Sequence, residues 1–118
     1  MVEVFVTDEF ETWYKLLKSD EALMDDIDTG VRLLEEIGTT LGYPWSSAIR
    51  EANPLRELRI QSRGRAIRIF YAFDPKRNAV LPLGGDKTGG NRFYKKMVPE
   101  ALKLWTKYLA EQEVSSDD

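Results

Sequence analysis

The segment 55–71 reads LRELRIQSRGRAIRIFY, and its apolar and polar residues alternate with a period of two. This alternation predicts β-strands over 55–61 and 65–73, joined by a tight Ser-Arg-Gly turn at 62–64. The first strand should direct Leu58 and Ile60 to one face and Glu57, Arg59 and Gln61 to the other. The second should direct Ile67, Ile69, Tyr71 and Phe73 to one face and Arg68, Phe70 and Ala72 to the other.

Outward from this hairpin, the chain reads as an α+β domain in the order β-α-α-β-β-β-α. Residues 2–6 form a short strand, 8–18 a helix capped by Thr7, and 19–37 a second helix that starts at Ser19 and stops at Gly38. The stretch 39–54 has no sustained period and is expected to be a surface connector. A third hairpin strand follows at 79–85, where Pro82 indicates an edge or a bulge. Residues 92–97 form a separate turn that leads into a last helix over 99–112.

This order predicts a small twisted antiparallel sheet packed against two N-terminal helices and a C-terminal helix. A chain of 118 residues with 42% apolar content is long enough for one domain, expected over residues 1–113, with a disordered acidic tail at 114–118. It contains no stretch apolar enough to cross a membrane and no export signal at its start, so a cytoplasmic protein is expected.

The composition also limits the chemistry. The chain has no cysteine and no histidine, which excludes thiol nucleophiles, Ser-His pairs and metals held by Cys or His. No metal or other cofactor is expected, and any catalysis must use Lys, Arg, Tyr, Asp or Glu.

Charge is distributed unevenly along the chain. Residues 1–49 carry three bases against eleven acids, residues 50–107 carry fourteen bases against five acids, and 108–118 carry four acids and no base. The net charge of −3 therefore conceals a basic middle segment. This asymmetry favours a polyanionic partner such as nucleic acid, and the alternative is an ordinary solvated surface.

Five of the bases lie in the hairpin itself. Arg59 and Arg68 are expected on adjacent strands, where two like charges repel unless water, an acid or a bound anion separates them. Glu57, together with water, could neutralise the two arginines. Phosphate binding is the favoured interpretation, because one nearby acid cannot pair with five guanidinium groups. These groups belong to Arg56, Arg59, Arg63, Arg65 and Arg68.

Two further segments could contribute to an anion site. The glycine-rich run GGDKTGGN (84–91) lacks the Walker A spacing, but it could form a flexible loop that presents Lys87 to an anion, or else a plain turn. In RFYKK (92–96), aromatic rings alternate with bases, as in proteins that stack unpaired bases; the alternative is an ordinary helix start. Trp13, Trp45 and Trp105 are interpreted as packing residues.

The ordered set of ELR, RIFYAFDP, VLPLGGDKTG and RFYKKMVPEA resembles the RelE/ParE superfamily, and within it the HigB-like branch of phage-derived Gp49-like proteins. The resemblance covers nearly the whole chain. It implies a toxin of a type II toxin–antitoxin module with a RelE-like fold. Many such proteins cleave messenger RNA in the ribosomal decoding site, so the resemblance implies the ribosome and mRNA as partners, along with a cognate helix-turn-helix (HigA/Xre-like) antitoxin and no membrane. The alternatives are a ParE-like inhibitor of DNA gyrase and a non-catalytic nucleic-acid-binding module.

The resemblance also implies a metal-free ribonuclease site at the residues that match the family's motifs. The catalytic candidates are Arg59, Arg68, Lys87 and Tyr94. The RNA- and phosphate-binding candidates are Arg56, Arg63, Arg65, Arg92, Lys95 and Lys96. Some HigB-like proteins use histidine, which is absent here, so the RelE-like version with Lys, Arg and Tyr is expected. The arginines would stabilise charge on phosphorus, Tyr94 would stack or transfer a proton, and Lys87 could be the base only if its pKa were lowered.

Overall fold

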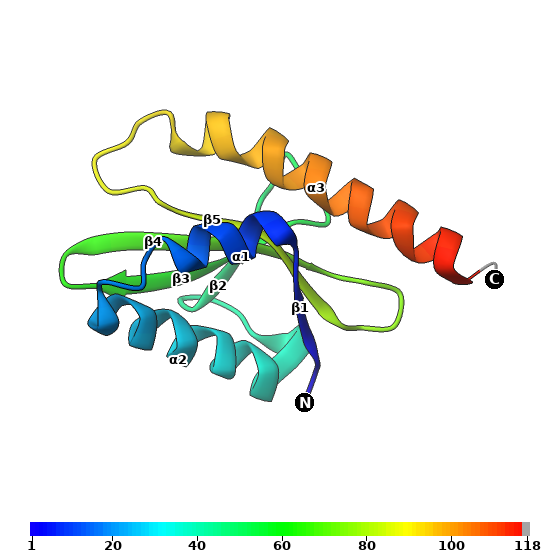
Figure 1. Ribbon diagram of the computed structural model, residues 1–118, viewed down its shortest axis with the longest axis horizontal. Coiled ribbons are helices and arrows are strands. Elements are labelled where there is room, and N and C mark those ends of the chain that lie inside the picture. The colour runs from blue at the N-terminus through cyan, green and yellow to red at the C-terminus, as the bar shows by residue number, and fades with distance from the viewer. Residues whose placement is uncertain (117–118) are drawn as a thin grey trace.

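The predicted hairpin forms the centre of a five-stranded sheet in the computed structural model of the protein (Figure 1). The structure describes residues 1–116, and side chains as far as residue 113. Its elements, in chain order, are β1 (Val4–Val6), α1 (Asp8–Lys15), α2 (Glu21–Ile37), the 3₁₀ helix η1 (Gly38–Thr40), β2 (Ser46–Ala48), β3 (Arg56–Ser62), β4 (Arg65–Phe73), β5 (Ala79–Asp86) and α3 (Phe93–Ser116). The α+β class is confirmed. No helix among these residues is long and apolar enough to span a membrane.

The strands are arranged in the order β1-β5-β4-β3-β2. The predicted meander of β3, β4 and β5 is confirmed, but the purely antiparallel sheet is not, because β1 pairs with β5 in parallel, with Val4 opposite Ala79. The expectation that 39–54 is only a connector is also wrong. Its residues 46–48 form β2, which pairs antiparallel with β3. Three residues reading SSA are too short to show a period, so this strand exists through its partner.

Helices cover both faces of the sheet, with α1 and α2 on one side and α3 on the other (Figure 1). The two faces predicted for the hairpin accordingly line two separate cores. Leu58, Ile60, Ile67, Ile69 and Tyr71 pack in the core under α1 and α2. Phe70 and Ala72 pack in the core under α3, together with Val80, Ala101 and Trp105. Hydrophobic burial on both faces fixes the register, since a shift of one residue would exchange the two sets.

The ends of the helices follow local hydrogen bonding. Thr7 caps α1 as predicted, because its Oγ accepts a bond from the Phe10 amide over 3.1 Å, although α1 ends at Lys15 rather than at residue 18. Asp20, and not Ser19, caps α2 by accepting from the Leu23 amide over 3.1 Å. Gly38 ends α2 as predicted, with a φ of 73°.

The last helix differs from its prediction. It runs without a break from Phe93 through Pro99, so residues 92–97 do not form a separate turn. The proline removes the bond to the Lys95 carbonyl, and both residues are exposed, so water can satisfy that carbonyl. The helix continues to Ser116, into the segment predicted as an acidic tail, and residues 117–118 lie outside the described part of the chain.

Glycines in β5 allow close packing of the layers. A Cβ atom at Gly84 would collide with the Trp13 ring of α1, and one at Gly85 would lie 2.9 Å from the Phe93 ring of α3. Pro82 lies in the same strand, between β1 and β4, where the β4–β5 register shifts between Phe70 and Ala72. The bulge predicted from Pro82 is therefore present, in an interior strand and not at an edge.

Candidate functional site

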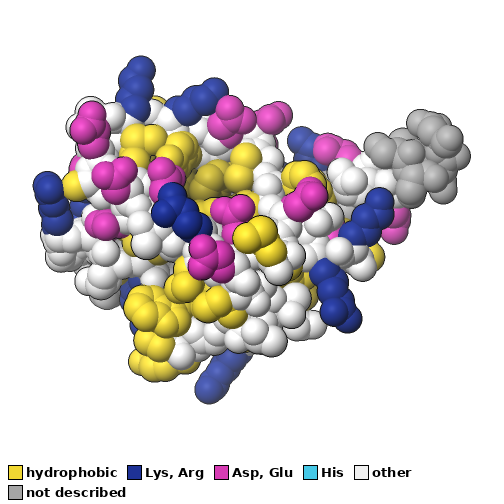
Figure 2. Space-filling model, turned by 90° about the horizontal axis from the view of Figure 1, so that it is seen from below, with side chains coloured by type: hydrophobic (Ala, Val, Ile, Leu, Met, Phe, Trp, Pro, Cys, Tyr) yellow, Lys and Arg dark blue, Asp and Glu magenta, His cyan; other side chains and the backbone are white. Residues whose placement is uncertain are grey.

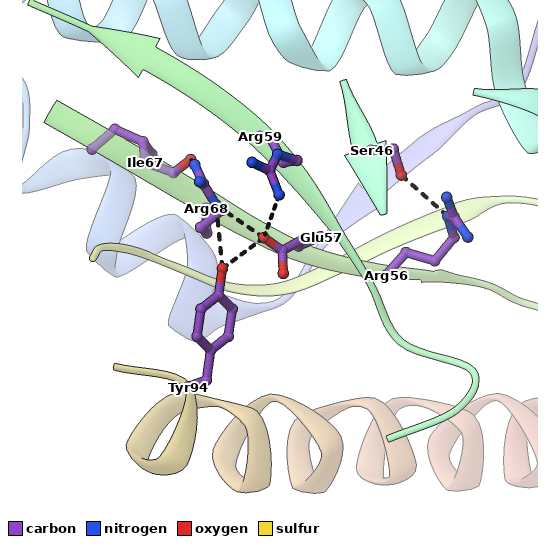
Figure 3. A network of polar contacts seen from close by, with 7 residues as sticks. All are labelled: Ser46, Arg56, Glu57, Arg59, Ile67, Arg68 and Tyr94. Atoms are coloured by element: carbon purple, nitrogen blue, oxygen red, sulfur yellow. Dashed lines mark hydrogen bonds and ion pairs between the residues drawn. The ribbon is translucent and has the colours of Figure 1, made fainter. Parts of the chain in front are cut away.

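A buried carboxylate lies at the centre of a polar cluster on the α3 side of the sheet (Figure 3). Glu57 Oε1 forms an ion pair with Arg68 Nε at 2.9 Å and accepts a hydrogen bond from the Tyr94 hydroxyl at 2.7 Å. Arg68 Nε also lies 3.3 Å from the Tyr94 oxygen, and Arg59 Nη1 lies 3.9 Å from Glu57 Oε1. Glu57 and Arg68 are each only 5% exposed. We refer to these four residues as the Glu57 cluster.

Strand register and helix position build the cluster together. Arg59 and Arg68 lie directly opposite one another in the β3–β4 pair, and Glu57 is two residues before Arg59, on the same face. Tyr94 reaches the cluster from the first turn of α3 (Figure 3). Its ring packs edge-on against Phe70 of β4, with centroids 6.4 Å apart, so the hydroxyl is held over the sheet by packing as well as by hydrogen bonds.

The interpretation in which Glu57 neutralises an arginine is confirmed for Arg68. Arg59 keeps 35% of its side chain exposed and approaches Glu57 less closely. Lys87, which follows β5, places its ammonium 5.6 Å from the centre of the Tyr94 ring. Two cations therefore lie within 4 Å of one carboxylate and a third lies over the Tyr94 ring, so the site carries more positive than negative charge.

Burial raises the pKa of Tyr94, and its hydrogen bond to the Glu57 carboxylate raises it further, against the opposing effect of Arg68. Tyr94 is consequently a neutral phenol near pH 7 and donates a hydrogen bond to Glu57. It is suited to orienting the carboxylate and to donating a proton, and unsuited to acting as a base.

The other predicted cations do not join this cluster. Arg56 lies on the opposite face of β3, where its Nε donates to Ser46 Oγ at 3.1 Å and its Nη2 to the Leu41 carbonyl at 3.5 Å. Arg65 pairs with Asp20 at the start of α2. Arg63 is exposed in the β3–β4 turn, with a φ of 50°. The remaining three cations are exposed, before and within the first turn of α3. Lys95 lines a groove with Glu57 and Tyr94, whereas Arg92 and Lys96 line another groove with Trp13.

Residues of the Glu57 cluster contribute to the walls of two grooves. A cavity of about 730 Å³ includes Glu57 and Tyr94 and continues along Ile49, Val98 and Leu102. A smaller one of about 260 Å³ is lined by Pro44, Trp45, Arg59, Ile60, Gln61 and Arg68. An extended chain that crosses the cluster could therefore contact both grooves.

A third groove, of about 410 Å³, lies between α1 and α2 and is unsuited to anions. Its walls include Phe10, Ile27 and Val31, and its rim carries Glu11, Asp28 and Glu35 with a single cation, Arg32. Figure 2 shows acidic side chains around an apolar hollow on the side of the molecule where α2 lies. The acidic N-terminal part of the chain is thus directed away from the Glu57 cluster.

Sequence reasoning missed two features of this region. The sequence indicates Glu57 only as a neutralising group, and its position at the centre of the cluster is the first feature missed. The period of two in the strand is the signal that could have shown this, because it places Glu57 on the face of Arg59 and Arg68. Trp45 was interpreted as a packing residue, yet it is 54% exposed, and Tyr43 beside it is 78% exposed. No sequence signal could separate an exposed tryptophan from a buried one in a segment without periodicity. Among residues 1–116, no group of acidic side chains is arranged to hold a metal ion.

Comparison with known proteins identifies the family of the chain. Residues 15–106 match the family described as phage-derived protein Gp49-like (DUF891). The chain is 34% identical over 110 residues to HigB3, a candidate toxin of Mycobacterium tuberculosis, and the match covers 92% of this chain and 95% of HigB3. It is 32% identical over 98 residues to HigB2, a candidate toxin of the same organism, covering 80% of this chain and 49% of HigB2. The resemblance predicted from the sequence is confirmed, and the chain belongs to the Gp49-like family, in its HigB-like branch.

Proposed function

We propose that this protein is the toxin of a type II toxin–antitoxin module and a metal-free endoribonuclease that cuts messenger RNA at the ribosome. The observation that carries the proposal is the Glu57 cluster. A carboxylate, two guanidinium groups and a protonated phenol meet at one point, with the ammonium of Lys87 beside them. These groups can supply a base, charge stabilisation and proton donors without a metal ion.

In the proposed reaction, the ribose 2′-hydroxyl attacks the adjacent phosphorus atom and gives its proton to Glu57. The bond to the 5′-oxygen breaks, leaving a 2′,3′-cyclic phosphate and a 5′-hydroxyl. Arg59 and Arg68 stabilise the charge on the equatorial phosphate oxygens. Lys87 donates a proton to the departing 5′-oxygen, and Tyr94 holds Glu57 in position.

The ion pair between Glu57 and Arg68 is compatible with this role. When Glu57 accepts the proton of the 2′-hydroxyl it loses its negative charge, while negative charge grows on the phosphate. Arg68 then exchanges a carboxylate partner for a phosphate partner. Because this second interaction exists fully only in the transition state, it lowers the barrier and does not merely tighten substrate binding.

The test is expression of the protein without an antitoxin, with transcript ends mapped during growth arrest. We expect arrest with new 5′-hydroxyl ends in coding regions, and at least a 10²-fold slower cleavage by Glu57→Gln. Arg32→Gln, at a charged position between α1 and α2, serves as a matched control and should arrest growth like the wild type. Arrest with intact transcripts and broken chromosomal DNA would instead favour gyrase inhibition. Undiminished cleavage by Glu57→Gln would overturn the mechanism.

We further propose that the antitoxin is a small helix-turn-helix protein encoded beside the toxin. Family membership supports this partner, and the adjacent reading frame tests it. Co-expression of that reading frame should restore growth and yield a complex that co-purifies with the toxin.

A further inference from the structure

We propose that Tyr43 and Trp45 form a nucleobase-binding site next to the Glu57 cluster, which holds the base that neighbours the cleaved phosphate by stacking. The inference rests on the proposed RNA substrate, but it assigns a new role to a segment outside the cluster. Two large aromatic side chains, 78% and 54% exposed, lie two positions apart in the loop before β2. Hydrophobic burial does not account for either ring.

The loop that carries the two rings is fixed to the sheet. The Trp45 amide donates to the Gly42 carbonyl at 3.1 Å, and the Trp45 carbonyl accepts from the Arg59 amide at 2.8 Å. Next to it, buried Ser46 contacts the Tyr71 hydroxyl at 2.5 Å through its Oγ. The backbone that carries the rings is thus held in place before a ligand arrives, which reduces the entropy lost when a base binds.

The rings adjoin the charges that would bind the phosphate. The guanidinium carbon of Arg59 lies 5.5 Å from the centre of the Tyr43 ring, so the arginine bridges the aromatic loop and the Glu57 cluster. The groove of about 260 Å³ contains Trp45 together with Arg59 and Arg68. A nucleotide whose phosphate lies between the two arginines would therefore place its base within reach of Trp45.

The chemistry of the groove favours a base over an apolar peptide segment. Its volume is below the range of about 300–1,000 Å³ typical of drug-sized ligands, which suits a single flat ring system. Aromatic faces and guanidinium planes stack on any base, and two cations line this groove with no acid among its residues. Gln61, exposed at its wall, offers both an amide donor and an acceptor to a base edge.

The experiment measures binding of a short single-stranded 2′-O-methyl oligoribonucleotide of mixed sequence to the otherwise unmodified protein, because this probe lacks the attacking 2′-hydroxyl and cannot be cleaved. Trp45→Ala should weaken binding about 5- to 150-fold, the range measured for losing one base–aromatic stack. Trp45→Phe should lose less, because phenylalanine retains a ring, and Tyr43→Ala should also weaken binding. Quenching of tryptophan fluorescence by the oligonucleotide should be much reduced in Trp45→Phe, because Trp105 is 4% exposed and Trp13, which is partly buried, does not line this groove.

Leu16→Ala is the matched control, since Leu16 is an apolar residue 75% exposed at the end of α1. It should bind RNA like the parent protein. Equal affinity of the parent, Trp45→Ala and Tyr43→Ala would overturn the nucleobase site while leaving the ribonuclease proposal intact. Absence of oligonucleotide binding, together with intact transcripts in cells that express the unmodified protein, would overturn both. Loss of antitoxin binding with unchanged RNA affinity would instead identify the loop as a protein interface, and would also overturn this inference.

Discussion

The Tyr94 hydroxyl donates a hydrogen bond to Glu57 Oε1 over 2.7 Å and thereby joins the first turn of α3 to the second residue of β3. The same oxygen of Glu57 holds Arg68 of β4. One carboxylate oxygen thus connects both strands of the hairpin to a helix that begins 20 residues after β4. The contact serves the fold and the proposed chemistry at once, so the predictions below separate stability from activity.

Removal of the carboxylate should destabilise the protein strongly. Glu57→Ala leaves the guanidinium of Arg68 buried and unpaired, and we expect the free energy of unfolding to fall by about 3–5 kcal/mol. Urea unfolding near pH 7 measures this change. The double variant Glu57→Met with Arg68→Met removes both charges and should recover most of the loss. A change below about 1 kcal/mol in Glu57→Ala would mean that water already solvates the pair.

Tyr94→Phe should keep the fold and impair cleavage. The variant loses one hydroxyl that contacts Glu57 and Arg68, which should lower the free energy of unfolding by about 0.5–1.5 kcal/mol. The rate of cleavage should fall by more than the decrease in folded protein accounts for, because Glu57 is no longer held in position. Comparison of the rate of cleavage with the fraction folded under the same conditions makes the distinction.

The raised pKa of Tyr94 makes its contribution to the free energy of unfolding depend on pH. The folded pKa lies above the unfolded value of 10.0, so the contribution of the phenol is fully present below pH 10.0 and is lost as the pH rises through the folded pKa. The difference in unfolding free energy between wild type and Tyr94→Phe should therefore be constant from neutral pH to about 10 and shrink above it. A difference that grew with pH would contradict this assignment.

Arg56 and Arg59, three residues apart on opposite faces of β3, should behave oppositely. Arg59→Ala should weaken RNA binding and slow cleavage with little effect on stability, since its side chain is 35% exposed. Arg56→Ala should leave cleavage per folded molecule unchanged and lower the melting temperature, because Ser46 and the Leu41 carbonyl lose a donor. Both variants remove one positive charge, so each is a control for the other. Equal losses of RNA affinity would show that only net charge matters.

The Asp20–Arg65 pair should stabilise the fold without affecting RNA cleavage. A hydrogen bond from the Leu23 amide holds the pKa of Asp20 below its usual range, and Arg65 lowers it further. Because the folded pKa is depressed, this stabilisation is present above the unfolded value of 3.8 and is lost as the pH falls through the folded pKa. Arg65→Ala should thus be less stable than wild type at pH 7, and the two should converge in strong acid. Reduced RNA affinity in Arg65→Ala at pH 7 would contradict the separation of this pair from the site.

Gly84→Ala should be destabilising by about 1–3 kcal/mol, because its methyl group would enter the space of the Trp13 ring. Gly64→Ala is a useful comparison: Gly64 has a φ of 83° but nothing lies within 4 Å of an added Cβ. Its cost should come from backbone strain alone. Thermal unfolding of both variants, with Trp13→Ala added to Gly84→Ala, tests whether the ring causes the effect.

Much of this protein follows from local patterns. The alternation in 55–71 predicted the hairpin, the residues on each of its faces and the pairing of Arg59 with Arg68 across the strands. It could do so because successive side chains in a strand point to opposite faces of the sheet. Thr7, Gly38 and the motifs shared with HigB-like proteins are likewise local, which is why the two helix ends and the family could be predicted.

Tertiary structure decided what those local patterns leave open. The partners of β1 and β2 depend on strands far along the chain, and no period in three residues can specify them. The sequence identified an arginine-rich hairpin, but only the packed layers separated its cations, placing Arg56 and Arg65 against the α2 side and Arg68 against Glu57. The physical reason is that charge acts through space. Which carboxylate a guanidinium meets depends on the distance between elements in the folded chain, and that distance is set by burial of the two cores.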